Sequence, residues 1–174
     1  ANVEALGCDS TRIAVGGDSA GANLATVVCL RARDEGAAAP AMQLLIYPVT
    51  ECERELPTRE RYEEGFLLTR RSMDFFEANY LPPGTDRGDP RVSVLQADDL
   101  GNLPLAYLAT AGFDPLRDEG EAYAQRLREA GSPVALRRHA GLVHSYANLT
   151  AICPSARAAM LEAAGALRTG LAQR

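Results

Sequence analysis

Apolar residues along the chain switch repeatedly between the two-residue period of strands and the longer period of helices. Short apolar runs predict four strands, at Arg12–Val15, Met42–Tyr47, Leu105–Ala111 and Val134–Arg138. Stretches with helical periodicity separate and follow these runs. This alternation is typical of βα units, so we predict an α/β protein with a parallel sheet.

Three flanking helices are predicted from apolar residues spaced three or four positions apart. An apolar stretch from Ala22 to Leu30 follows the first strand. The second helix carries Tyr123, Leu127 and Ala130 on one face and ends at Gly131. The last helix begins near Pro154, and its apolar stripe consists of Met160, Ala164, Leu167 and Leu171. These helices supply the layers that flank the predicted sheet.

The segment from 50 to 89 interrupts this alternation. Nine of the fifteen residues from Glu51 to Gly65 are charged. A helix follows, predicted from Thr69 as its cap, from Met73, Phe76 and Tyr80 at helical spacing, and from Pro82–Pro83 as its end. We therefore divide the chain into a core, residues 1–49 and 90–174, and an insertion, residues 50–89. The alternative interpretation of the insertion is a solvated surface helix.

Composition narrows the classes of protein that this chain can be. With 174 residues, 47% hydrophobic and 24% charged, the chain can form one domain with a substantial core. The net charge of −5 argues against a nucleic-acid partner, and no apolar run has the length of a membrane span. The four cysteines, Cys8, Cys29, Cys52 and Cys153, show no metal-binding spacing. We expect no metal or cofactor, a core position for Cys29, and a cytoplasmic location.

A glycine-rich turn after the first predicted strand places Ser19 as a candidate nucleophile. The residues from Gly16 to Gly21 lie between that strand and the apolar helical stretch. In such a tight turn the serine adopts a strained backbone conformation and its hydroxyl is exposed above the sheet. Gly17 and Gly21 are expected because side chains there would collide where strand and helix pack closely. The alternative is an ordinary glycine-rich βα turn.

A nucleophilic serine needs a base and an acid. When the serine lies on a strand-to-helix turn of this kind, the acid comes later in the chain and the base, a histidine, comes after the acid. The chain has two histidines. His139 ends a predicted strand, whereas His144 lies in the loop beyond it. A base that reaches a serine above the sheet belongs on such a loop, so we choose His144 and expect a surface role for His139.

Asp114 is the candidate acid. It follows the apolar run Leu105–Ala111 and precedes Pro115, which disfavours continuation of the strand, so it is expected at the carboxyl end of a buried strand. Its rival, Asp118, is placed to cap the next helix with Glu121 at the third position. We therefore interpret Asp118 as structural.

Several motifs together resemble the hormone-sensitive-lipase-like (family IV) group of α/β-hydrolase esterases. They are Gly-Asp-Ser-Ala-Gly at 17–21, Tyr47–Pro48, Asp-Pro-Leu-Arg-Asp-Glu-Gly at 114–120, and Gly141 with His144. Two small departures from the family pattern are Ala22 after the serine turn and Ser145-Tyr146 after the histidine. The resemblance covers nearly the whole chain and extends the predicted fold to the α/β-hydrolase class.

The resemblance implies a site and a reaction. Ser19, Asp114 and His144 correspond to the family's catalytic triad, with Gly17, Asp18 and Gly21 in the nucleophile elbow. The backbone N–H of Ala20 corresponds to one oxyanion donor, and residues 50–89 to part of the cap, or lid. The implied activity is that of a carboxylesterase- or lipase-type serine hydrolase on small esters with short or medium acyl chains. We expect the pocket walls to include Phe66, Leu67, Val143 and Tyr146, for which plain packing is the alternative.

The region before the serine departs most from the family. Family members carry a His-Gly-Gly-Gly stretch upstream of the serine that supplies most of the oxyanion hole, and no such stretch precedes Ser19 here. We infer that the 174 residues are the C-terminal half of the fold, with family strands five to eight, and that their catalysis is impaired. The first strand would then have a bare edge, so self-association into a homo-oligomer through that edge is expected.

Two other functions remain open. Plant gibberellin receptors resemble this family but bind a hormone without hydrolysing it, and they lack the histidine that is present here as His144. The chain could thus be a non-catalytic relative that binds a small ligand, or an inactive fragment that serves only in assembly. The retained histidine favours the hydrolase.

Overall fold

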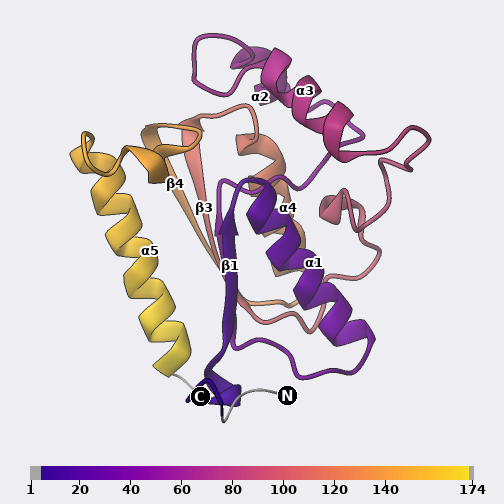
Figure 1. Cartoon of the computed structure of the whole chain (residues 1–174), viewed down its shortest axis with the longest axis vertical. Coiled ribbons are helices and arrows are strands. Elements are labelled where there is room, and N and C mark those ends of the chain that lie inside the picture. The colour runs from indigo at the N-terminus through magenta and orange to yellow at the C-terminus, as the bar shows by residue number, and fades with distance from the viewer. Residues whose placement is uncertain (1–4, 173–174) are drawn as a thin grey trace.

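A parallel four-stranded sheet forms the centre of the molecule in the computed structural model, which describes residues 5–172 (Figure 1). The strands are β1 (Ala14–Asp18), β2 (Met42–Ile46), β3 (Leu105–Phe113) and β4 (Val134–Val143), and they lie in the order β1-β2-β3-β4. All three pairings are parallel. The carboxyl ends of the strands therefore meet at one edge of the sheet, as the predicted α/β architecture requires.

Helices cover both faces of this sheet (Figure 1). On one face, α1 (Ala20–Asp34) and α4 (Arg117–Glu129) pack against Leu45 and Leu108. On the other face, α5 (Pro154–Ala172) packs against Met42 and Tyr107, which lie on the same two strands as those leucines. Because β2 and β3 are buried on both faces, they carry near-continuous apolar runs. Full burial of a leucine such as Leu108 stabilises the fold by about 1.5–3 kcal/mol.

The face of α5 that meets the sheet differs from the predicted stripe. The buried residues are Ala156, Ala159, Ala163 and Gly170. Met160 and Leu167 are half-buried and Ala164 is exposed. The helix lies so close to the sheet that a Cβ on Gly170 would be 2.4 Å from the Met42 sulfur. The side chains at this contact are small, and the predicted stripe of larger apolar residues lies beside the face that meets the sheet.

All four predicted strands have different bounds in the structure, and the first and the last differ most. Residues Ser10–Arg12 form a 3-10 turn, η1, so β1 starts later and continues through the glycines to Asp18. At the other end of the sheet, β4 passes through His139 and ends at Val143. The extension is possible because β3 and β4 keep pairing beyond an irregularity between Ala111 and Phe113. His144 consequently follows its strand directly.

The insertion carries α2 (Pro57–Arg61) and α3 (Arg70–Tyr80), which lie beyond the carboxyl ends of the strands (Figure 1). The predicted cap of α3 is confirmed, because the Thr69 hydroxyl accepts a hydrogen bond from Ser72 N. Met73 is the buried residue of α3, whereas the large aromatic side chains on the helix are mostly exposed. The division into core and insertion remains a prediction, although the position of α3 over the strand ends agrees with it.

Two short 3-10 turns, η2 (Val94–Gln96) and η3 (Tyr146–Leu149), complete the elements. None of the helices within residues 5–172 combines the length and the apolar character that crossing a membrane requires. In the same range, β1 is an edge strand of the sheet. Self-association through this edge stays a prediction.

Candidate active site

Ser19 lies between the last residue of β1 and the first residue of α1. Its backbone angles are φ 52° and ψ −119°, a region that residues with a side chain rarely adopt. Ser19 N donates to the carbonyl of Ile46 at 2.9 Å, and the Ser19 carbonyl accepts from Val49 N at 3.2 Å. The end of β2 and the loop after it therefore hold the strained residue in place, as expected for an exposed nucleophile on a strand-to-helix turn.

The two glycines around Ser19 have different roles. A Cβ on Gly17 would lie 2.4 Å from the carbonyl carbon of Gly21 and 2.8 Å from Ala22 N, so only glycine fits at 17. A Cβ on Gly21 would meet no atom within 4 Å in the described part of the chain. The prediction that both glycines relieve a collision is thus confirmed for Gly17 and wrong for Gly21. The close approach occurs on the Gly17 side of the turn, where the strand passes under the helix backbone.

This difference predicts opposite outcomes for two matched variants. Gly17→Ala is expected to lower the free energy of unfolding by about 1–3 kcal/mol or more, because the new methyl group meets backbone atoms that cannot rotate away. Gly21→Ala is expected to be neutral or stabilising by up to about 1 kcal/mol, since alanine is the better helix former. Urea unfolding of both variants measures the difference. Equal losses of stability would contradict this account of the turn.

The structure brings the three sequence-predicted site residues together. His144 Nε2 lies 3.0 Å from Ser19 Oγ, and His144 Nδ1 lies 2.8 Å from Asp114 Oδ2. His144 is 3% exposed and Asp114 is fully buried. An ionised carboxylate only accepts hydrogen bonds, so Asp114 holds the proton of the neutral imidazole on Nδ1. Nε2 is then left with its lone pair toward the serine hydroxyl.

The sheet topology explains why these three side chains lie together. Ser19 follows β1, Asp114 follows β3 and His144 follows β4, so all three lie at the carboxyl edge of one sheet. The second carboxylate oxygen of Asp114 accepts from Leu116 N at 2.8 Å. This bond fixes the orientation of the carboxylate at the start of α4.

Tyr47 supports the imidazole and had no predicted role. Its ring centroid lies 4.6 Å from that of His144, and its hydroxyl donates to Asp18 Oδ2 at 3.2 Å. Burial and the neighbouring Asp18 carboxylate raise the pKa of the Tyr47 phenol, so it remains a donor. Tyr47 also has a positive φ of 36°. The Tyr47–Pro48 dipeptide at the end of a strand was the sequence signal for this contact.

Ser145 and Tyr146 follow His144 directly in the chain. Ser145 adopts the left-handed conformation with φ 60°, where glycine is the usual residue. Tyr146 is buried, and its ring packs edge-on against Tyr47 at 4.9 Å and His139 at 5.5 Å. The expected surface role of His139 is therefore wrong, because the extended β4 carries its ring to a half-buried position.

Ala20 is the first residue of α1, next to the serine. The N–H groups of a helix's first turn have no acceptor within the helix, and the aligned peptide dipoles make this end positive. The Ala20 N–H can therefore stabilise negative charge that develops beside Ser19. This placement agrees with the donor implied by the family resemblance.

A cavity of about 430 Å³ lies over Ser19 and His144. Most of its lining is apolar, with Leu24 from α1, Met73, Phe76 and Tyr80 from α3, and Val92 from the loop that follows. Among the described residues that line it, the carboxylate of Glu77 and the guanidinium of Arg59 carry charges. A cavity of this size and character can take a small, mostly apolar molecule.

The four predicted pocket residues are not among the residues that line this cavity within the described range. Phe66 stacks on Phe113, with centroids 5.5 Å apart, and Leu67 is exposed with a φ of 72°. Val143 ends β4, and the buried Tyr146 ring packs against Tyr47. These predictions were wrong for this cavity because proximity in sequence to the site did not reveal which way each side chain points. Leu68, the next residue after Leu67, does line it.

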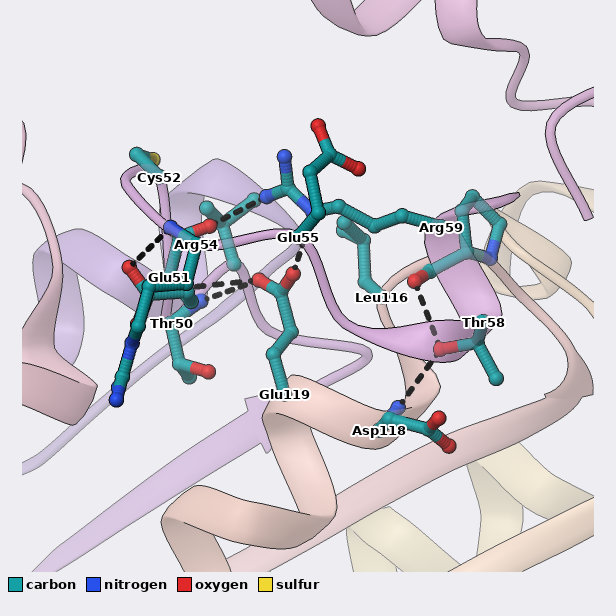
Figure 2. Close-up of polar contacts among 12 residues, drawn as sticks. Thr50, Glu51, Cys52, Arg54, Glu55, Thr58, Arg59, Leu116, Asp118 and Glu119 are labelled. Atoms are coloured by element: carbon teal, nitrogen blue, oxygen red, sulfur yellow. Dashed lines mark hydrogen bonds and ion pairs between the residues drawn. The ribbon is translucent and has the colours of Figure 1, made fainter. Parts of the chain in front are cut away.

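A buried polar network joins α4 to the insertion (Figure 2). The Glu119 carboxylate is fully buried and accepts from Thr50 N at 2.8 Å, Glu51 N at 3.2 Å and Arg59 Nε at 2.9 Å. Burial raises the pKa of Glu119 to about 7, although Arg59 and the backbone donors oppose that rise. The sequence did not reveal this role, because acidic residues in the first turn of a helix are usually solvated.

Asp118, the neighbour of Glu119, does not cap α4 as predicted. The helix begins at Arg117, and Leu116 occupies the N-cap position without a side-chain hydrogen bond. Asp118 instead pairs with Arg117 at 3.1 Å. Its backbone N–H donates to the Thr58 hydroxyl at 3.1 Å, and that hydroxyl donates to the Pro115 carbonyl at 3.0 Å (Figure 2). The helix starts two residues earlier than the capping pattern predicted.

No group of three or more His, Cys, Asp or Glu residues within the described range could hold a metal ion. All four cysteines are free, and Cys29 is buried in the core as predicted. Burial raises the pKa of the Cys29 thiol to about 12, so this side chain is an inert packing group.

A serine on a strand-to-helix turn, followed in the chain by an aspartate and then a histidine at the same sheet edge, is the arrangement of α/β-hydrolase-type serine hydrolases. A family described as "alpha/beta hydrolase fold" matches residues 1–148, and the chain belongs to this family.

Named relatives agree with this assignment. The chain is 46% identical over 167 residues to the carboxylic ester hydrolase LipN of Mycobacterium tuberculosis, a match covering 93% of this chain and 44% of LipN. It is 37% identical over 169 residues to an ethyl acetate hydrolase of Pseudomonas putida, covering 97% and 53%. The crystal structure of EstE1, a thermophilic carboxylesterase cloned from a metagenomic library, matches with a TM-score of 0.94 and 39% identity, covering 98% and 58%.

The chain spans about half the length of the curated relatives that it matches. These relatives are named as hydrolases of esters, which is consistent with the resemblance to the hormone-sensitive-lipase-like group.

Proposed function

We propose that this chain carries the nucleophile, base and acid of a carboxylic ester hydrolase that acts on small esters with short or medium acyl chains. The observation that carries the proposal is the hydrogen-bonded series from Ser19 through His144 to the buried Asp114, with distances of 3.0 and 2.8 Å. The mostly apolar cavity above the serine supports a small, uncharged substrate.

The geometry supports a two-step reaction through an acyl-enzyme. His144 Nε2 takes the proton of Ser19 as Oγ attacks the ester carbonyl, and Asp114 stabilises the imidazolium that forms. His144 then donates this proton to the leaving alcohol. A water molecule, deprotonated by the same imidazole, releases the acid and restores the serine.

The Ala20 N–H is the oxyanion donor that we assign within the described residues. Loss of one such donor typically lowers kcat by about 10²–10³-fold, so the rate depends strongly on how many donors face the oxyanion. We therefore expect the 174 residues alone to be a weak catalyst, and faster turnover in a protein that adds further donors.

Hydrolysis of p-nitrophenyl acetate and butyrate tests the proposal. The assay is run on these 174 residues and on the protein encoded together with any adjoining coding sequence of the gene. We expect ester turnover in at least the longer protein. Saturable binding of the esters without turnover in both proteins would instead support a non-catalytic, receptor-like relative, and neither binding nor turnover in folded protein would support an inactive fragment.

A further inference from the structure

A second cavity, of about 210 Å³, adjoins the cavity above Ser19. Its lining is largely charged and includes Arg54, Glu55, Arg70 and Asp74. Four residues line both cavities and so form the wall between them: Cys52, Arg59, Met73 and Glu77. Ser19 and His144 line only the first cavity, so the reacting atoms and the charged cavity lie on opposite sides of this wall.

An ion pair forms the polar part of the wall. Arg59 Nη1 donates to Glu77 Oε1 at 3.3 Å, and Glu77 also pairs with Arg87. The Arg59 side chain is 5% exposed and that of Glu77 is 22% exposed. The wall is therefore mostly closed to solvent.

The Arg59 half of the wall is anchored from behind (Figure 2). Its Nε donates to the buried carboxylate of Glu119 at 2.9 Å, and its Nη2 donates to the Glu51 carbonyl. Displacing the guanidinium would leave the Glu119 carboxylate buried without its charged partner, which is strongly unfavourable. Arg59 is thus fixed, and an apolar chain in the first cavity cannot push it aside.

We propose that the Arg59–Glu77 pair is a specificity-determining wall that limits the length of the ester's apolar group. This inference rests on the proposed ester hydrolase function. An apolar chain that extends from Ser19 gains free energy along the apolar lining and stops where it meets the ion pair. To pass further, it would have to separate two paired charges and enter a cavity that offers it little apolar contact.

Glu77 is the residue to change, because Arg59 is tied to the buried Glu119. Glu77→Ala removes half of the pair and opens the wall beside Met73. Glu77→Gln is the control for shape, since it keeps the side-chain length and an acceptor for Arg59. Asp74→Ala is the control for position, because Asp74 lies on the same helix but lines only the charged cavity.

Two measurements test whether the Arg59–Glu77 pair limits the length of the apolar group. The first is kcat/KM for p-nitrophenyl esters from acetate to decanoate, with Ser19 present. The second is the dissociation constant of the same esters in each variant combined with Ser19→Ala, which is expected to bind without turnover. Glu77→Ala should move the preferred chain length upward by one or two methylenes, with a gain of about fourfold per added methylene in both measurements. Asp74→Ala should keep the parental profile, and Glu77→Gln, which loses the charge but keeps the side-chain length and an acceptor for Arg59, should shift it less than Glu77→Ala.

An unchanged profile in folded Glu77→Ala, or the same shift in Asp74→Ala, would overturn the proposal. If Glu77→Ala does not fold, Glu77→Asp replaces it in the experiment. Aspartate keeps the charge but is shorter by one methylene, so it should give a smaller upward shift in preferred chain length. No shift in folded Glu77→Asp would also overturn the proposal. The two proposals fail differently. A shift in binding without turnover in any Ser19 protein refutes the hydrolase and keeps the wall, whereas turnover with unshifted profiles refutes the wall and keeps the hydrolase.

Discussion

Ser19→Ala is expected to lower kcat on p-nitrophenyl butyrate by roughly 10⁴–10⁶-fold, because the atom that would attack the ester is removed. Ser19 has the only side chain in hydrogen-bond contact with His144 Nε2 within the described residues. Alanine loses one hydroxyl and fits the same turn, so the melting temperature and the binding of ester should change little. The measurement is steady-state hydrolysis, with enzyme at high concentration for the variant.

Ser155→Ala provides the matched control for this experiment. Ser155 is exposed near the start of α5, on the layer opposite to α1, and is not among the described residues that line the cavity above Ser19. This variant should keep the parental rate. If Ser19→Ala retained more than about a tenth of the activity in folded protein, Ser19 could not be the nucleophile and the proposed mechanism would be wrong.

Asp114→Asn is expected to lower kcat by about 10⁴-fold while the protein stays folded. The reason lies in the direction of one hydrogen bond. Asp114 Oδ2, at 2.8 Å from His144 Nδ1, accepts a hydrogen bond from Nδ1–H and so leaves Nε2 free to take the proton of Ser19. An asparagine can turn its amide N–H toward Nδ1 instead. The imidazole then carries its proton on Nε2 and cannot act as a base.

Asp118→Asn is the control, because Asp118 lies in the same motif but pairs with Arg117 and does not contact the imidazole. It should retain most of the activity. The double variant of Ser19→Ala with Asp114→Asn should be no slower than Ser19→Ala alone, since the residues of a triad act as one unit. Additive losses in the double variant would show that Asp114 acts independently of the serine.

The turn around Ser19 separates what the local sequence predicts from what depends on packing. The glycine-rich turn indicated a strained serine, and the structure gives Ser19 a φ of 52°. The same pattern could not tell which glycine meets the backbone of the other element. That depends on how the strand passes under the helix, and the helix extends from Ala20 to Asp34 rather than over the shorter predicted stretch.

The sequence by itself determined the alternation of strands and helices, the Ser19 turn, and Asp114 and His144 as the acid and base candidates. These features depend on neighbours a few positions apart and on the order in which parallel strands present their carboxyl ends. Short-range periodicity and motif order carry such information without any knowledge of the packing.

Only the tertiary structure decided the extent of β4, the small-residue face of α5, the walls of the cavity and the Arg59–Glu119 network. Each of these depends on which surfaces meet. Arg59 and Glu119 are separated by 60 residues, and their types would equally suit a solvated surface. Burial turns these polar side chains into fixed partners, and burial is a property of the assembled layers that no local pattern contains.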